Sequence, residues 1–379
     1  MIEQAIDIRI DMRSSLQPLG EQVKILERMR EAEVLAESLN EQRRLGQVSA
    51  YLSGYFIQAG DDTIQAIEKG ERAFAIASAI GNFSLQVQAN HFLGSAHRLT
   101  GDFDRAIYHF KKNVDALVGD QIYERFGLAF VASVGSLSHL TWGLSEVGEF
   151  NEAAIHGNEA IRIAEVANHP FSLNTAYLEV GYLHFKKGAM EKAIALLERS
   201  LEVCHLWDLR QNLPRVMVAL GNALAAAGRV GEAMSLLELT NERARNSWTR
   251  AQLAHGYLLV GKIEEATSLA CRVFELSQTQ GYRGHAALSL YVLGESLLHA
   301  GTQDAAKAED HYDHAMALAN ELRMRPLVAH CQVGLGKLHR KTGDLEQAMA
   351  HLANGAAMMR EMEMGLWLER AEVELKELS

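Results

Sequence analysis

The chain has 379 residues, of which 48% are hydrophobic and 22% charged, and its formal net charge at neutral pH is −11. A chain of this length can bury a large core, and the presence of only 4 prolines among many Ala, Leu and Glu residues favours helices. The negative charge argues against duplex nucleic acid or an anionic membrane as the main partner, so we expect neither.

The cysteines are Cys204, Cys271 and Cys331. Because they are odd in number, far apart and outside any CxxC motif, they predict neither a zinc site nor a disulfide framework. We expect all three to be small buried residues in a reducing compartment. The opening "MIEQAIDIRIDMR" has no apolar core of a signal peptide, which also favours a cytoplasmic protein.

Residues 1–45 are expected to form a degenerate first repeat around Gly20. Ile2, Ile6 and Ile10 recur at helical spacing with no polar cap before them, as though more repeat preceded them. An uncovered apolar face of this kind favours self-association. We therefore expect either a homodimer through this end or packing of these residues against the next repeat of the same chain.

Between residues 46 and 364 one pattern recurs eight times around a glycine. It is clearest in "LGSAHRLTGDFDRAIYHF", which starts at Leu93, and "LGKLHRKTGDLEQAMAHL", which starts at Leu335. An apolar residue usually lies eight positions before the glycine, and in most of the units an alanine lies five after it. The glycines are Gly60, Gly101, Gly148, Gly188, Gly228, Gly261, Gly301 and Gly343.

Each unit predicts two antiparallel helices, A and B. Helix A ends at the glycine, which tolerates a left-handed C-cap. Asp102 and Asp344 follow their glycines directly and can accept the free N–H groups that open helix B. Pro170, Pro214 and Pro326 lie near the starts of later A helices, where a missing N–H costs nothing. One pair cannot bury both faces, so successive pairs must stack.

This pattern resembles the tetratricopeptide repeat, W-x₂-L-G-x₂-Y…A-x₃-F…P over about 34 residues. Leu93, Gly94, Ala106 and Phe110 match that template, whereas the tryptophan is absent, the closing proline is displaced and the period is longer. The resemblance implies an all-α fold, a TPR-like α-solenoid of eight to nine antiparallel helix pairs in a right-handed superhelix. We expect one domain over residues 1–379.

Residues 365–379 are expected to form an amphipathic helix that caps the array. Its predicted solvent-facing residues are Glu369, Arg370, Glu372, Glu374 and Lys376.

A narrower resemblance concerns four stretches: "AIDIRIDMRSSLQPLGE", "ERFGLAF", "NHPFSL" and "MRPLVAHCQVGLGKLHRKTGD". They are similar to the C-terminal repeat region of bacterial multidomain signalling proteins, in which a class III nucleotide cyclase domain precedes a STAND-type ATPase and then such repeats. This resemblance implies a sensing or scaffolding tail whose partners are upstream ATPase or cyclase domains. The chain contains neither GxxxxGK[ST] nor cyclase-like metal carboxylates.

A stretch without charged side chains runs from Phe126 to Ser145. Its serines, glycines, threonine and histidine favour a buried helix plus loop over a membrane span.

The longest interval between turn glycines contains an insertion, "GDQIYERFGLAF", from Gly119. Insertions in repeat proteins map to loops, often on the binding face. Tyr123, Arg125 and Phe126 are therefore candidate contacts, and the alternative is a loop that folds back over apolar surface.

One cluster could hold a metal: Asp310, His311, Asp313 and His314 lie within about one and a half helical turns. A solvated helix face beside a repeat turn is the favoured interpretation. No nucleophile with a paired base and no phosphate-binding loop occurs, so we expect no enzyme activity, no cofactor and no metal.

The predicted binding groove consists of helix A positions on the side away from the Leu-Gly stripe. Counted in phase with the turn glycines, these residues are His91, Arg98, Trp142, Tyr182, Lys186, Arg215, Asn222, Trp248, His255, Tyr291, Glu295, His330, Lys337 and Arg340. Aromatic and arginine side chains are typical anchors of binding surfaces. We expect a locally positive inner face, with packing between helices as the alternative for individual residues.

These observations predict a non-catalytic module that binds a protein or peptide segment, or a small acidic ligand, and reports its occupancy to upstream signalling domains. Two alternatives stay open. One is a structural oligomerisation scaffold that uses the convex face or an exposed end, and the other is the sensor domain of a transcriptional regulator.

Overall fold

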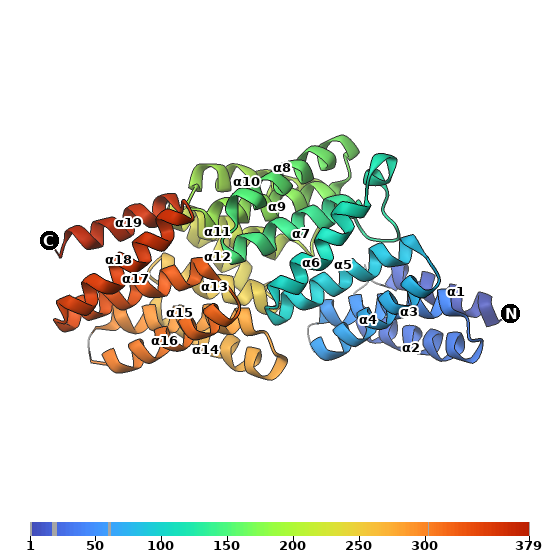
Figure 1. The fold of residues 1–379 in the computed structure, drawn as a ribbon, viewed down its shortest axis with the longest axis horizontal. Helices are drawn as coiled ribbons and strands as arrows, with labels where there is room; N and C mark the ends of the chain where they lie inside the picture. Colours follow the sequence, from blue (N-terminus) through green and yellow to red (C-terminus); the bar gives the residue numbers. More distant parts are fainter. Residues whose placement is uncertain (1, 17–20, 60–61, 302, 379) are drawn as a thin grey trace. The chain divides into compact units, whose positions relative to one another are not determined.

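The computed structural model describes residues 2–16, 21–59, 62–301 and 303–378, and Figure 1 shows these as helices joined by short connections. Throughout these ranges no strand is present. The prediction of an all-α helical-repeat fold is confirmed. The chain divides into two compact units, residues 1–136 (unit 1) and 137–379 (unit 2), and the boundary falls inside α7 (Ala132–Val147).

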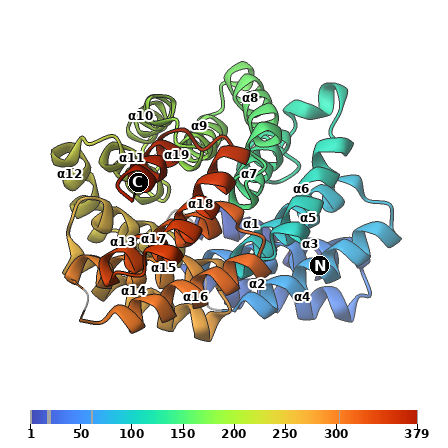
Figure 2. The same ribbon diagram turned by 60° about the vertical axis from the view of Figure 1, so that its left-hand side comes forward.

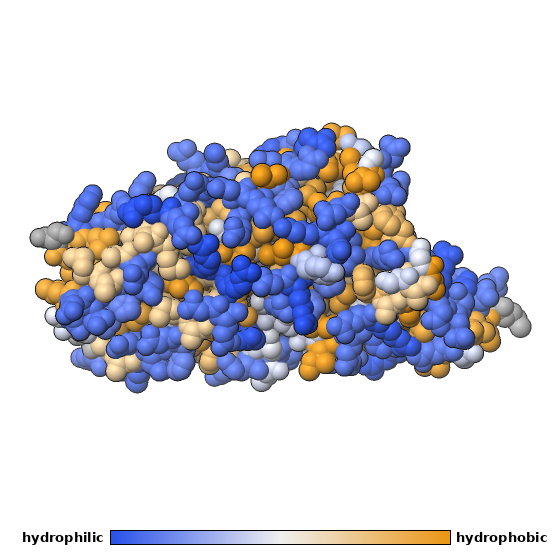
Figure 3. Space-filling model, in the orientation of Figure 1, coloured by the Kyte–Doolittle hydropathy of each residue, from blue (hydrophilic) through white to orange (hydrophobic). Residues whose placement is uncertain are grey.

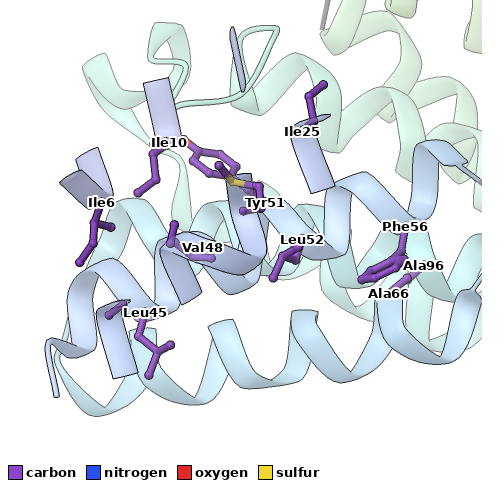
Figure 4. Packing of buried hydrophobic residues seen from close by; sticks show 13 residues of the cluster. Ile6, Ile10, Ile25, Leu45, Val48, Tyr51, Leu52, Phe56, Ala66 and Ala96 are labelled. Carbon is purple, nitrogen blue, oxygen red and sulfur yellow. The ribbon is translucent and has the colours of Figure 1, made fainter. Parts of the chain in front are cut away.

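Unit 1 consists of three helix pairs and the start of α7. The helices are α1 (Ile2–Leu16), α2 (Gln22–Ser38), α3 (Gln42–Ala59), α4 (Thr63–Ala79), α5 (Phe83–Thr100) and α6 (Phe103–Ala116), followed by the 3₁₀ helix η1 (Gly119–Tyr123). Figure 4 shows Ile6 and Ile10 of α1 packed beside Val48 and Tyr51 of α3. The N-terminal isoleucines at these two positions therefore pack against the next repeat, which was one of the two expected outcomes.

Unit 2 continues the same alternation and ends in an unpaired helix. Its helices after α7 are α8 (Phe150–Ala167), α9 (Pro170–Lys186), α10 (Met190–Leu206), α11 (Leu213–Ala226), α12 (Val230–Asn241), α13 (Ser247–Leu259), α14 (Ile263–Gln280), α15 (Arg283–Ala300), α16 (Ala305–Glu321), α17 (Arg325–Thr342), α18 (Leu345–Glu361) and α19 (Gly365–Lys376). Odd-numbered helices are the A helices and even-numbered ones the B helices.

The turns between A and B helices follow from the local sequence. Gly101 ends α5 with φ of 83°, a left-handed conformation that glycine adopts without strain. Asp102 then accepts a hydrogen bond from the Arg105 amide at 3.1 Å, and Asp344 does the same for Gln347 at 3.1 Å. The predicted N-caps are therefore confirmed. Gly20 and Gly60 lie outside the described residues.

The predicted proline and alanine positions are also confirmed. Pro170, Pro214 and Pro326 lie in the first turns of α9, α11 and α17. Ala106 and Ala348, five residues after their turn glycines, are fully buried, which permits the close approach of helices A and B.

Two further expectations concern burial. None of the described helices is long and apolar enough to cross a membrane, and α7 is instead buried in the array. Cys204 and Cys331 are buried, but the prediction for Cys271 is wrong because this residue is exposed. Its neighbours Ala270 and Val273 form the buried stripe of α14, and Cys271 is rotated about 100° from Ala270. Hydrophilic side chains predominate on the face shown in Figure 3.

Candidate functional site

The predicted groove residues of unit 2 come from consecutive A helices, and their rings contact one another from helix to helix. Tyr182 of α9 stacks on Trp142 of α7 with ring centroids 6.5 Å apart, and it meets Trp248 of α13 edge-on at 5.6 Å. Farther along, Tyr291 of α15 contacts His255 of α13 at 6.2 Å and His330 of α17 at 5.9 Å. The structure thus brings these side chains together along the A helices.

In unit 1, the predicted groove residues are His91 and Arg98, both on α5. The His91 ring lies 5.0 Å from that of Phe130 and is buried. Burial, followed by the nearby positive charge of Arg98, lowers the pKa of His91 to about 3. His91 is therefore a neutral part of the core of unit 1 at physiological pH.

The expectation of an uncompensated positive inner face is wrong for the cations of unit 2. Lys186 lies 3.1 Å from Glu146, and Arg215 lies 2.9 Å from Glu179. Both glutamates are buried.

The same holds farther along the array. Lys337 lies 2.9 Å from the buried Glu295, and Arg340 lies 2.7 Å from Glu374 of α19. The inner face is consequently a set of closed ion pairs rather than a positive patch. Whether the predicted groove residues contact a ligand stays a prediction.

Buried tyrosines share these glutamates. The Tyr182 hydroxyl donates to Glu146 at 2.7 Å and accepts from the Gln252 side chain at 3.2 Å, while the Tyr312 hydroxyl donates to Glu295 at 2.8 Å. Burial opposes ionisation of Glu295, yet the charge of Lys337 and the hydrogen bonds from Lys337 and Tyr312 hold its pKa below the usual value. The Glu295 carboxylate is therefore held in its charged form between Lys337 and Tyr312.

Asn222 is packed between A helices rather than facing a groove. Its side-chain amide is fully buried and donates to the Gln252 carbonyl at 3.0 Å.

The histidines of the inner face are neutral. Burial, with Lys186 as the next contribution, lowers the pKa of His255 to about 4 and that of His330 to about 3. Both rings therefore act as aromatic surface at physiological pH.

The feature that sequence reasoning missed is the position of α19, which lies against the inner face of unit 2 (Figure 2). Trp367 is 7% exposed. Its ring meets Phe185 edge-on at 5.8 Å and His330 at 5.1 Å, and its indole N–H donates to the Phe185 carbonyl at 3.1 Å. Arg370 donates to the Ala226 carbonyl at 2.7 Å. Arg370 is exposed, as expected, although its guanidinium also reaches α11.

The turns beside α19 also contact one another across unit 2. The Leu366 amide donates to the Gly188 carbonyl at 3.4 Å, and Lys187 pairs with Glu363 at 2.9 Å. A Cβ atom on Gly188 would lie 2.8 Å from the Leu366 nitrogen, so glycine is required for this approach. The last turn of unit 2 thus closes against one of its early turns.

The insertion in unit 1 is held by its own side chains. The Arg125 guanidinium donates to the Leu128 carbonyl at 3.0 Å, and the Phe126 ring meets Phe83 at 5.5 Å. Tyr123 is 41% exposed. Of the candidate loop contacts, Arg125 and Phe126 fold back onto the unit and Tyr123 faces solvent, and a binding role for them stays a prediction.

The Asp310–His314 cluster is an exposed pair on α16, with the two side chains 3.3 Å apart. Within the described ranges no group of three or more His, Cys, Asp or Glu side chains is arranged to hold a metal ion.

Comparison with known sequence families gives matches in three helix pairs. The tetratricopeptide repeat pattern matches residues 175–204, 214–238 and 329–354, which correspond to α9–α10, α11–α12 and α17–α18. The chain contains tetratricopeptide repeats. Its remaining helix pairs continue the same architecture. Comparison with curated protein sequences gave no match.

Several solved structures have a similar fold. A Rap protein complexed with Competence and Sporulation Factor is 14% identical, with a TM-score of 0.54 over 88% of this chain and 99% of that one. The Rap conjugation gene regulator of plasmid pLS20 in complex with the Phr* peptide is 14% identical, with a TM-score of 0.57 over 95% and 96% of the two chains.

A third similar structure is a STAND protein with a tetratricopeptide repeat sensor from Pyrococcus horikoshii. It is 13% identical, with a TM-score of 0.50 over 99% of this chain. The present chain spans 55% of that protein's length.

Proposed function

We propose that this chain is a non-catalytic module that binds a protein or peptide segment on the inner face of its tetratricopeptide repeats. The observation that carries the proposal is the continuous row of rings on the A helices of unit 2, from Trp142 to His330, set between closed ion pairs. Trp142, Tyr182 and Trp248 are buried, whereas His255, Tyr291 and His330 are half-buried. The half-buried rings, with nearby charges already paired, suit a ligand that brings apolar anchors. The similar Rap structures are complexes with a factor and a peptide, which supports the same use of the fold.

Trp248 is the groove residue whose removal tests the proposal most directly. Its ring is 9% exposed and lies under the Arg215 guanidinium at 5.1 Å. Trp207 offers a matched control, because it is the same residue type but 55% exposed at the end of α10. Peptides selected from a display library on the immobilised intact chain would be measured by calorimetry against wild type, Trp248→Ala and Trp207→Ala.

We expect Trp248→Ala to weaken binding by about 2 kcal/mol at every salt concentration and Trp207→Ala to leave it unchanged. If a folded Trp248→Ala variant binds as wild type does, the inner face of unit 2 is not the site. Loss of binding in Tyr123→Ala would then assign the contact to the insertion of unit 1.

The finer part of the proposal is that the module is the sensor or scaffold tail of a signalling ATPase or cyclase. The resemblance of four stretches to such repeat regions and the shared fold with a STAND protein's sensor support it. The reading frame upstream of Met1 decides the matter: an encoded phosphate-binding loop supports the tail role, and a natural translation start there removes it.

A structural oligomerisation scaffold is the second candidate. The exposed Ile2 and Ile8 on α1, at 45% and 59%, are the observation in its favour. Sedimentation of the wild type and of Ile8→Glu separates the scaffold from the binding module. Only for a scaffold should the substitution lower the mass of the assembly.

A further inference from the structure

The last helix, α19, contacts unit 2 in the manner of a bound ligand. Its contacts with α9 and α11 are made by the Trp367 indole N–H and the Arg370 guanidinium, each of which donates to a main-chain carbonyl. These carbonyls belong to Phe185 and Ala226, in the last turns of α9 and α11. Carbonyls at helix C-termini lack the usual partners four residues on and carry partial negative charge, although the Phe185 carbonyl also accepts from the Gly188 amide at 3.0 Å. This surface of unit 2 therefore favours ligands that bring hydrogen-bond donors and positive charges.

A third contact extends the same face of α19. Glu374 and Glu377 both pair with Arg340 of α17. Trp367, Arg370, Glu374 and Glu377 follow one another at intervals of three, four and three residues, which places all four on one face of a helix. One stripe of α19 thus supplies an aromatic anchor, a cation and two anions in order.

The hold on α19 is uneven along its length. Trp367 and Ala371 are buried, whereas Glu374 is half-buried and Glu377 is exposed. The preceding turn contains Glu363 with a φ of 54°, and Met364 at the N-cap makes no side-chain capping bond. A 12-residue helix of this kind is marginal by itself, so it depends on the stripe for its position.

We propose that α19 occupies, within the chain, the surface that a helix of a partner protein takes. This inference rests on the proposed function and names both its ligand and its regulation. The partner is an amphipathic helix that carries a tryptophan, an arginine three residues later, and glutamates seven and ten residues after the tryptophan. The partner helix can bind only when α19 leaves this surface. The chain with α19 in place is therefore self-inhibited.

Self-inhibition predicts a specific quantitative behaviour. When the competent state is a small fraction of the population, the apparent dissociation constant is raised by the inverse of that fraction. Changes in α19 that leave the surface intact should therefore tighten the binding of a helix added in solution. A structural cap would show no such effect.

The test uses the full chain and a fluorescent peptide that copies residues 363–378. Two variants change α19 alone: Trp367→Ala, and the double substitution Glu374→Gln with Glu377→Gln. Val373→Ala is the matched control, since Val373 lies on α19 but outside the stripe. Fluorescence anisotropy gives the dissociation constants, and circular dichroism confirms that each variant is folded.

We expect the peptide to bind Trp367→Ala at least about tenfold more tightly than wild type, because an aromatic anchor contributes on the order of 2 kcal/mol. The double variant should show a smaller gain in the same direction and Val373→Ala none. A peptide with alanine at the tryptophan position should bind no chain. If Trp367→Ala does not fold, the double variant decides alone, because its exposed substitutions leave no cavity.

Three outcomes overturn the inference. Equal peptide affinity for wild type and the folded variants means that α19 does not compete for the surface. Absence of peptide binding to a folded variant means that the surface does not accept a helix from outside. A wild-type dimer that dissociates on Trp367→Ala means that the occupant is α19 of a second copy. In each case selected library peptides can still bind the intact chain, so failure here is distinguishable from failure of the proposed function.

Discussion

The helix pairs α5–α6 and α17–α18 contain matching eighteen-residue segments with nine identical residues, and their local structures are similar. The His97 and His109 rings stack at 5.7 Å with an angle of 5°, and the His339 and His351 rings stack at 5.3 Å with an angle of 14°. In each pair the second histidine hydrogen-bonds an amide side chain of helix A, at 3.0 Å and 2.7 Å. The shared histidines therefore find equivalent partners in both pairs, although the amides come from Asn90 and Gln332, outside the eighteen-residue segments.

Different segments of the chain cover the A helices of these two pairs. In unit 1 the insertion supplies Phe130, which contacts His91 of α5 at 5.0 Å. In unit 2 the terminal helix supplies Trp367, which contacts His330 of α17 at 5.1 Å. The inner surface of a repeat is thus completed by segments that do not repeat, and those segments decide what surface is available to a partner.

The largest expected effect is a loss of stability, and it tests the packing between helices A and B that the two pairs share. Phe110 and Leu352 are fully buried beneath Gly94 and Gly336. Phe110→Ala should cost about 3–5 kcal/mol of unfolding free energy and Leu352→Ala about 2–5 kcal/mol, because both leave cavities. All 4 tryptophans lie in unit 2, so urea unfolding followed by tryptophan fluorescence reports unit 2 and circular dichroism reports both units. A loss below about 1 kcal/mol in either variant would show that the pairs are not equally well packed.

The next effect tests the two covered histidines by pH. The folded pKa of His91 and of His330 is about 3, whereas an exposed histidine has a pKa of about 6.5. The unfolded chain therefore binds more protons as pH falls below about 6.5, and stability, complete above this value, declines. At pH 5 the buried His91 accounts for a loss of up to about 2 kcal/mol and the half-buried His330 for less.

The pH dependence is measured by urea unfolding between pH 7.5 and pH 5, a range above the ordinary titration of carboxylates. His91→Gln and His330→Gln should each flatten the decline. Unchanged slopes would mean that the covering rings leave these histidines open to water.

A smaller effect isolates the closing contact of α19. Gly188 and Gly228 have φ values of 80° and 83° at equivalent turns, but only Gly188 lies against Leu366, and a Cβ on Gly228 would meet nothing within 4 Å. Alanine at either position costs about 1–2 kcal/mol of backbone strain. Gly188→Ala should in addition increase hydrogen exchange of the α19 amides, and Gly228→Ala should not. Equal exchange in both variants would contradict a tight contact at this turn.

The smallest effect concerns the charged end of α19. Arg340→Ala removes its pairs with Glu374 and Glu377, which are partly exposed. Such pairs contribute at most about 1 kcal/mol and are weakened by salt. At high salt the free energy of unfolding of Arg340→Ala should be close to that of the wild type. At low salt the C-terminal amides of α19 should exchange their hydrogens faster in the variant than in the wild type. A salt-independent loss above about 2 kcal/mol would indicate a buried rather than a surface pair.

The sequence allowed prediction of the helix pairs, because glycine, alanine and the capping aspartates act within a few residues. The charge state of the inner face was predicted wrongly because the partner of each cation lies one repeat away. Lys186 pairs with Glu146 over 40 residues and Lys337 with Glu295 over 42, which are repeat periods. Searching for opposite charges at that period would have found both pairs.

The position of α19 could not be predicted in the same way. Its amphipathic pattern fits a cap and a ligand equally well, since both need one apolar stripe. The approach of Leu366 to Gly188 depends on how all the intervening pairs stack, which the sequence of α19 alone does not contain.

The contact between Leu366 and Gly188 also has a kinetic meaning. It joins positions separated by many helices, so it can form only after the intervening pairs have stacked. During synthesis α19 is made after every other helix of unit 2, and the N-terminal parts of a chain fold first. For that interval the surface around Phe185 and His330 is folded but uncovered. This surface is therefore first accessible to other proteins on the nascent chain, before α19 can reach it.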